Sequence, residues 1–153
     1  MSYVLFDCTQ FVTFQTKEYK KIESLKGDFE NLGFIVYKDT EIQARKRAYF
    51  EDHFKGTVFE LFDQEFLGEF EDWKEVSQPT IKLEGLIRII EELAKDETIK
   101  GLKVMIVNCA SEDQEEDGIL QLAASADTAA KDLFSMSYWN FDVKSDVVIL
   151  NFE

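Results

Sequence analysis

The fold is indicated most clearly by residues 16–38, which read TKEYKKIESLKGDFENLGFIVYK. The first part of this stretch carries apolar residues at steps of three and four, which is the spacing of an amphipathic helix. These residues are Tyr19, Ile22, Leu25, Phe29 and Leu32. Thr16 is placed to cap the start of the helix, and Gly33 is placed to end it. Phe34–Tyr37 is a continuous apolar run, as in a central strand, so the stretch predicts a helix followed by a buried strand.

A strand is also expected before this helix. Tyr3–Phe6 is a short apolar run, and Phe11–Phe14 continues it or pairs with it. The order strand, helix, strand is typical of a βαβ unit. The crossover is long enough for the two flanking strands to pair in parallel.

The next part of the chain is harder to assign. Asp39 or Thr40 is placed to cap a second helix that ends near Gly56. Beyond it, Thr57–Phe62 has strand character, but the aromatic residues of this region fall at helical spacing. They are Phe59, Phe62, Phe66, Phe70 and Trp73. We favour a helix over residues 57–76, broken or kinked near Gly68 because glycine weakens a helix interior.

The second half of the chain begins at a break around Ser77–Thr80, which contains the only proline. An amphipathic helix follows, then a strand at Leu102–Val107. Ser111 begins an acidic junction, and an alanine-rich helix follows it to about Phe134. Asp146–Phe152 is the final strand. The sequence therefore predicts a single compact α/β domain over residues 1–153, with about four strands, helices between most of them and at least one βαβ unit. The order of the strands cannot be read from the sequence.

Charge limits the classes of partner. The chain has 31 acidic and 17 basic residues, which gives a formal net charge of -14. Such a chain repels nucleic acid and anionic membranes at long range and attracts basic partners. We expect a cytoplasmic protein that binds neither nucleic acid nor membrane. The N-terminus has no secretory-signal pattern, and no apolar run approaches the ~20 residues that span a bilayer.

No motif in the sequence specifies a reaction. Cys8 and Cys109 are far apart in the chain, and with the single histidine, His53, they cannot supply the ligands of a structural zinc site. Neither of the glycine-rich phosphate-binding motifs occurs, and a histidine-dependent hydrolase would have only His53 as its base. We therefore assign no catalytic residue and no cofactor, and we favour a protein that is not an enzyme.

Residues 60–75 form the first candidate interaction surface, because acidic residues there are interleaved with aromatic ones. In the simpler interpretation the rings lie in the core and the acids face water. In the functional interpretation, aromatic anchors inside a negative rim bind a basic protein, since charge speeds the encounter and buried rings prolong the complex. The partner-binding residues predicted in this segment are Glu65, Glu69, Asp72 and Trp73.

A second acidic cluster, Glu112–Asp117, follows a predicted strand. Its simpler role is to complement the dipole of the next helix, but Glu112, Glu115 and Glu116 are also predicted to bind the partner. Carboxylates at strand ends can instead hold Mg²⁺ or Ca²⁺, which would suit a metal-dependent enzyme or a small-ligand-binding protein. That alternative would use Asp7, Glu112, Asp113 and Asp117.

The only basic cluster is Arg45-Lys46-Arg47. Three consecutive helical residues point in different directions, which does not suit a phosphate site. Glu41 lies four residues before Arg45, and Glu51 lies four residues after Arg47. We therefore expect ion pairs along a helix here.

In composition and size, the chain resembles the small acidic immunity proteins and inhibitors that neutralise basic toxins or nucleases. The resemblance assigns no residue, but it implies a non-enzymatic protein-binding module that engages a basic partner. A homo-oligomeric structural protein, such as a homodimer with its interface near Trp139, is a further alternative.

Overall fold

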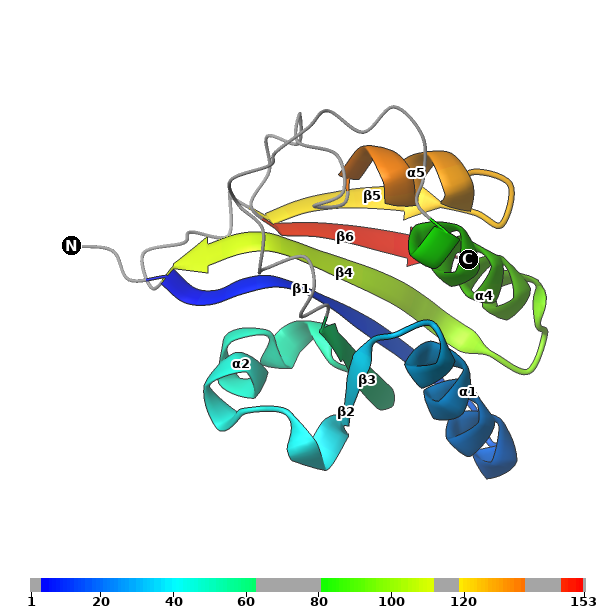
Figure 1. Cartoon of the computed structure of the whole chain (residues 1–153), viewed down its shortest axis with the longest axis horizontal. Helices are drawn as coiled ribbons and strands as arrows, with labels where there is room; N and C mark the ends of the chain where they lie inside the picture. Colours follow the sequence, from blue (N-terminus) through cyan, green and yellow to red (C-terminus); the bar gives the residue numbers. More distant parts are fainter. Residues whose placement is uncertain (1–3, 63–80, 112–118, 137–146, 153) are drawn as a thin grey trace.

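The computed structural model describes residues 4–62, 81–111, 119–136 and 147–152. Within these ranges the chain is mixed α/β, and six strands form one sheet in the order β2-β3-β1-β4-β6-β5 (Figure 1). The strands are β1 (Val4–Gln15), β2 (Ile35–Lys38), β3 (Thr57–Phe62), β4 (Lys100–Ser111), β5 (Ile119–Ala124) and β6 (Val147–Phe152). The helices are α1 (Tyr19–Asn31), α2 (Ala44–Tyr49), α4 (Ile81–Lys95) and α5 (Ala129–Met136), and the 3₁₀ turns η1 (Asp39–Glu41) and η2 (Glu51–His53) flank α2. No helix in these ranges has the length and apolar character needed to cross a membrane.

The stretch 16–38 forms the expected helix and strand, α1 and β2. The central position expected for the strand is wrong, because β2 lies at the edge of the sheet and Ile35 is 38% exposed. The cap expected at Thr16 is not formed: Glu18 is the N-cap of α1, and among the described residues no side chain caps the start of the helix. Thr16 Oγ1 instead accepts a hydrogen bond from the Glu18 N–H at 3.2 Å, just before the helix. Gly33 follows the helix with a φ of 101°, a left-handed conformation that favours glycine. The predicted helix after Pro79 and the strands at Leu102–Val107 and Asp146–Phe152 are confirmed as α4, β4 and β6.

The expected parallel pairing of the first two strands is wrong. Strand β3 lies between β1 and β2 and pairs antiparallel with both. Strands β1 and β2 therefore run in the same direction but are not neighbours. Among the described strands, the adjacent parallel pair is β5 and β6, with α5 between them in the chain. The expected βαβ unit is thus formed by a different part of the sequence.

The helix favoured from residue 57 onward is also corrected, because Thr57–Phe62 is strand β3. Val58, Phe59, Glu60 and Leu61 are all buried, since β3 has a strand on each side and packed layers on both faces. The helical spacing of Phe59 and Phe62 is a coincidence within a strand buried on both faces. Residues 63–76 of the favoured helix, with Gly68, lie outside the described residues.

Two further predictions need correction. The alanine-rich helix expected after the acidic junction, up to about Phe134, is instead strand β5 followed by the shorter helix α5. A turn separates them, in which Thr128 Oγ1 accepts a hydrogen bond from the Ser125 N–H at 2.9 Å. The helix expected between residues 39 and 56 is divided into η1, the six-residue α2 and η2. The sheet has six described strands, where about four were expected.

The sheet carries packed side chains on both faces. Helices α1, α4 and α5 cover one face, where buried residues such as Phe29, Leu86 and Leu133 meet Val12 of β1. Segment α2 packs on the opposite face, where Phe50 contacts the ring of Phe11 at a centroid distance of 5.6 Å. Val12 and Phe11 are successive residues of β1, so they point to opposite faces. The layers are therefore three helices, the sheet, and the α2 segment.

Candidate binding groove between α1 and α4

All seven partner-binding residues predicted from the sequence lie outside the described ranges. Glu65, Glu69, Asp72 and Trp73 fall in residues 63–80, and Glu112, Glu115 and Glu116 fall in residues 112–118. The same holds for Asp113, Asp117 and Trp139. Asp7 belongs to β1, where its register partner is Cys109 of β4. Within the described ranges, His, Cys, Asp and Glu side chains do not gather in a group of three or more that would suit a metal ion.

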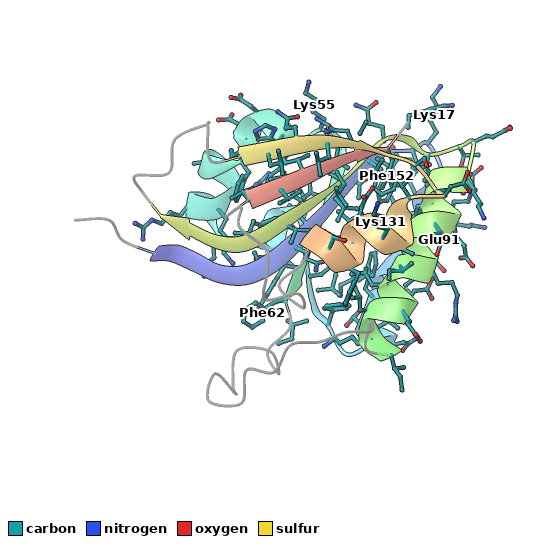
Figure 2. All side chains as sticks on the ribbon, turned by 90° about the horizontal axis from the view of Figure 1, so that it is seen from above. Lys17, Lys55, Phe62, Glu91, Lys131 and Phe152 are labelled. Atoms are coloured by element: carbon teal, nitrogen blue, oxygen red, sulfur yellow. The ribbon has the colours of Figure 1, made fainter. Side chains whose placement is uncertain are left out.

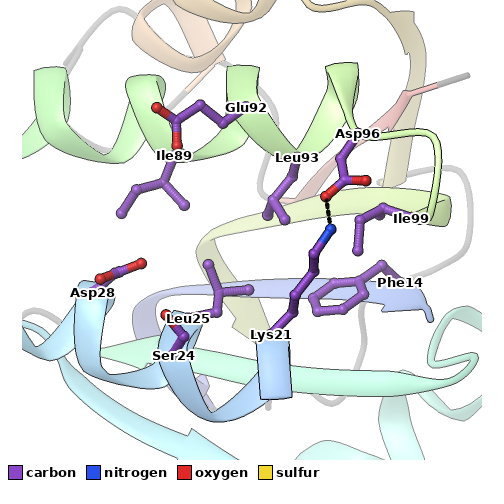
Figure 3. A pocket seen from close by; sticks show the side chains of 10 residues that line it. All are labelled: Phe14, Lys21, Ser24, Leu25, Asp28, Ile89, Glu92, Leu93, Asp96 and Ile99. Atoms are coloured by element: carbon purple, nitrogen blue, oxygen red, sulfur yellow. Dashed lines mark hydrogen bonds and ion pairs between the residues drawn. The ribbon is translucent and has the colours of Figure 1, made fainter. Parts of the chain in front are cut away.

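The structure instead shows a groove that sequence reasoning missed. Helices α1 and α4 pack on the same face of the sheet and leave a groove of about 200 Å³ between them (Figure 3). Its floor is apolar and its walls are polar. The floor is formed by Phe14, Leu25, Ile89, Leu93 and Ile99. The walls are formed by Lys21, Ser24, Asp28, Glu92 and Asp96.

Helical spacing explains why these side chains face one another. On α1, Ser24 and Asp28 lie four residues apart and therefore share one side of the helix. On α4, Ile89 and Leu93 are four residues apart, and Glu92 lies beside them. The buried residues of α4, such as Leu86 and Ile90, turn towards the sheet. Each helix thus presents the border between its apolar and polar sides to the groove.

One end of the groove is closed by an ion pair. Lys21 Nζ lies 2.5 Å from Asp96 Oδ2 and 3.4 Å from Glu18 Oε2. Asp96 Oδ1 accepts hydrogen bonds from the N–H and the hydroxyl of Thr98 at 2.9 and 2.7 Å. The bond from Lys21, followed by those from Thr98, lowers the pKa of Asp96 from 3.8 to about 2. The bond to Asp96 also raises the pKa of Lys21 above its ordinary value.

The low pKa of Asp96 predicts a pH dependence. A carboxylate whose pKa is lower in the folded protein stabilises it above the unfolded pKa and loses this effect as pH falls through the folded pKa. The loss of stability caused by Asp96→Asn should therefore be constant above a pH of about 5 and should shrink as pH falls from about 4 to about 2. Urea unfolding of the wild-type and Asp96→Asn proteins across this pH range measures the difference between their free energies of unfolding. A difference that persists unchanged at a pH of about 2 would contradict the role of Lys21.

The other end of the groove is negatively charged. Asp28 on α1 and Glu92 on α4 line the groove from its two sides (Figure 3). Both side chains are exposed, and neither forms an ion pair or hydrogen bond with another residue of the described ranges. Because Lys21 is paired with Asp96, its charge does not neutralise these two carboxylates. The groove therefore combines an apolar floor with two carboxylates, which suits the side chain of a lysine or an arginine.

The basic cluster is only partly as expected. Arg47 pairs with Asp39 at 2.8 Å, where the spacing had indicated Glu51. Lys46 reaches across to β3 and pairs with Glu60 at 2.6 Å. Glu60 is one of the acids in residues 60–75 that the simpler interpretation places facing water, but it is 1% exposed, because β3 lies between two strands and is covered on both faces. Thr9 Oγ1 donates a second hydrogen bond to the same oxygen, Glu60 Oε2, at 2.9 Å.

The chain has no recognised relative in the comparisons with known proteins. No protein-family model matches it, and neither a curated protein nor a solved structure matches it.

Proposed function

We propose that this protein is a non-enzymatic protein-binding module that engages a basic partner through the groove between α1 and α4. The observation that carries the proposal is the pair Asp28 and Glu92, two exposed carboxylates without ion-pair partners in the described ranges, on either side of an apolar floor. A module of this kind acts by occupying a basic surface of its partner, and it needs no catalytic group.

The groove suits a long basic side chain. The aliphatic stem of a lysine or an arginine packs on Leu25, Ile89 and Leu93, while its charged end lies between the two carboxylates. Charge-assisted hydrogen bonds to carboxylates are about twice as strong as neutral ones. The groove thus provides both the contact area and the charge that one anchoring side chain requires.

The charge of the whole molecule acts over a longer range. A net charge of -14 raises the rate at which a positively charged partner meets this chain. Glu65, Glu69, Asp72, Trp73, Glu112, Glu115 and Glu116 extend the proposed contact beyond the groove. Their contribution is a proposal from sequence, and replacing each acidic residue among them with lysine tests it alongside the groove.

The dependence of partner binding on salt concentration tests the proposed binding function. Immobilised protein is exposed to a native lysate at low and high salt, and retained proteins are identified by mass spectrometry. We expect a basic protein that is held at low salt and released at high salt, because screening weakens attraction between exposed charges. Titration of that purified partner should then give a dissociation constant that rises about tenfold or more for Asp28→Asn combined with Glu92→Asn. Binding that salt does not weaken would contradict the proposal.

A further inference from the structure

A second pocket lies on the opposite side of the sheet, and the register of β2 and β3 explains its composition. Tyr37 of β2 pairs directly with Glu60 of β3, so both side chains stand on the same face of the sheet. Phe62 lies two residues beyond Glu60 and therefore shares that face. The pocket has a volume of about 360 Å³, within the range of small-ligand sites. Figure 2 shows Phe62 well apart from Glu91 of α4, so this pocket is separate from the groove.

The rest of the pocket comes from the segment around α2. Lys46 projects from α2, and Glu41 and Gln43 come from the chain just before it. The Lys46 ammonium is 2.6 Å from Glu60 Oε2, and its side chain is only 12% exposed. The pocket therefore has a buried ion pair at one side and two aromatic side chains in its lining.

Glu60 retains capacity to bind a further donor. Its Oε2 accepts hydrogen bonds from Thr9 and Lys46, whereas its Oε1 accepts none from the residues of the described ranges. A carboxylate offers about four acceptor positions on its two oxygens. Glu41 adds a second carboxylate to the lining, and one of its oxygens accepts the Lys38 N–H at 3.1 Å. Two carboxylates against one ammonium give the lining a net negative charge, which selects a cation.

The stability that the buried ion pair adds to the fold does not explain why a glutamate occupies position 60. A buried ion pair contributes little net stability compared with well-packed apolar side chains of the same size. The neighbours of Glu60 on this face, Val58 and Phe11, are apolar and fully packed. A carboxylate here is consistent with a ligand that needs it.

We propose that this pocket binds a guanidinium group carried on an apolar stem, with the guanidinium donating to Glu60 Oε1 and lying against the rings of Tyr37 and Phe62. A planar guanidinium stacks on aromatic faces and donates several hydrogen bonds in one plane, which a lysine-type ammonium does not. The proposal concerns a different face from the groove and does not depend on the function proposed for it.

Agmatine is a suitable probe, because it carries a guanidinium at one end of a four-carbon chain. Its other end is a primary ammonium, for which butylamine is the control. Titration of the whole protein with agmatine, followed by amide shifts in NMR spectra, should give saturable shifts at Tyr37, Lys46 and Glu60. Butylurea has a similar planar group without charge, and butylamine has charge without a planar group. Both are expected to bind at least about tenfold more weakly, the loss associated with one charge-assisted hydrogen bond. Butylsulfonate tests whether Lys46 instead makes the pocket an anion site.

Two variants test the pocket. Glu60→Gln also breaks the buried ion pair with Lys46 and lowers stability, so Glu41→Gln is the one that keeps the test independent of folding. Glu60→Gln keeps the size of the side chain and should weaken agmatine binding about tenfold or more. Glu41 is exposed, so Glu41→Gln leaves the fold intact. This variant should weaken agmatine binding by a smaller factor. Asp28→Asn combined with Glu92→Asn, in the groove, should leave agmatine binding unchanged. The proposal is overturned if agmatine causes no saturable shifts at the pocket, if butylurea binds equally well, or if butylsulfonate binds in its place.

A further comparison identifies the source of the guanidinium. The peptide Gly-Arg-Gly with blocked ends presents the group as part of a protein chain, whereas agmatine presents it as a free small molecule. Stronger binding of the peptide would indicate an arginine side chain of a protein partner. Stronger binding of agmatine would indicate a free metabolite of this class.

Discussion

Replacing Lys46 with methionine is expected to lower the free energy of unfolding by about 3–5 kcal/mol, the usual cost of leaving one partner of a buried ion pair uncompensated. Glu60 is the partner, and its side chain is 2% exposed. Without the ammonium, a buried carboxylate loses its neutralising charge and keeps, among the described residues, the hydrogen bond from Thr9. Urea unfolding followed by circular dichroism measures the change.

The adjacent residue provides a matched control. Arg47 also forms an ion pair with an acid, but its side chain and that of Asp39 are 44% and 46% exposed. Replacing Arg47 with methionine should therefore cost less than about 1 kcal/mol. The double replacement of Lys46 with methionine and Glu60 with leucine should recover much of the lost stability, because both charges are then removed. Equal losses for Lys46→Met and Arg47→Met would contradict the burial of Glu60.

Replacing Gln10 with methionine is expected to raise the free energy of unfolding by about 1–3 kcal/mol, the cost of a buried polar group without a hydrogen bond. Gln10 lies in β1 between Leu61 and Ile106, and all three residues are fully buried. Within the described part of the chain, both its Oε1 and its Nε2 lack a hydrogen-bond partner. Methionine has a similar shape and no group that must be satisfied.

A substitution at another residue of the same strand should change the free energy of unfolding in the opposite direction. Thr13 is also buried, but its hydroxyl donates to the carbonyl oxygen of Lys55 at 2.9 Å. Replacing Thr13 with valine removes this bond and should lower the free energy of unfolding by about 1 kcal/mol. A Gln10→Met protein that is less stable than the wild type would show that the amide of Gln10 is satisfied in solution.

The parts of the fold that sequence predicted well are those with a single local pattern. In α1 and α4 the apolar residues repeat at helical spacing over 13 and 15 residues, so one face of each helix is defined. Gly33 marks a break that depends only on backbone conformation. Such signals are local and need no knowledge of neighbouring strands.

The errors arose where contacts between segments far apart in the sequence determine the secondary structure and the order of the strands. Strand β3 is buried on both faces, so it lacks the alternation that identifies a half-buried strand, and its aromatic residues imitate helical spacing. Strand β5 joins the sheet through β6, whose sequence comes 23 residues later, counted from Ala124 to Val147. The insertion of β3 between β1 and β2 is likewise a property of pairing, which a single sequence does not encode locally.

The candidate site was missed for a similar reason. Asp28 and Glu92 are ordinary exposed charges on their own helices, and only the packing of α1 against α4 brings them to one groove. The overall excess of acidic residues did indicate a basic partner, but it could not say which carboxylates lie together. Glu60 could have been found from the strand interpretation of Thr57–Phe62, which places it between apolar residues.

The most direct test of the binding groove compares two charge-reversed proteins in the same capture experiment. One carries Asp28→Lys and Glu92→Lys, which reverse the charge of the groove. The other carries Glu23→Lys and Glu84→Lys, which make the same change in net charge at exposed positions on α1 and α4 outside the groove. We expect the groove variant to lose the basic partner and the control to retain most of it. Equal retention by both proteins, or equal loss, would contradict a site between α1 and α4.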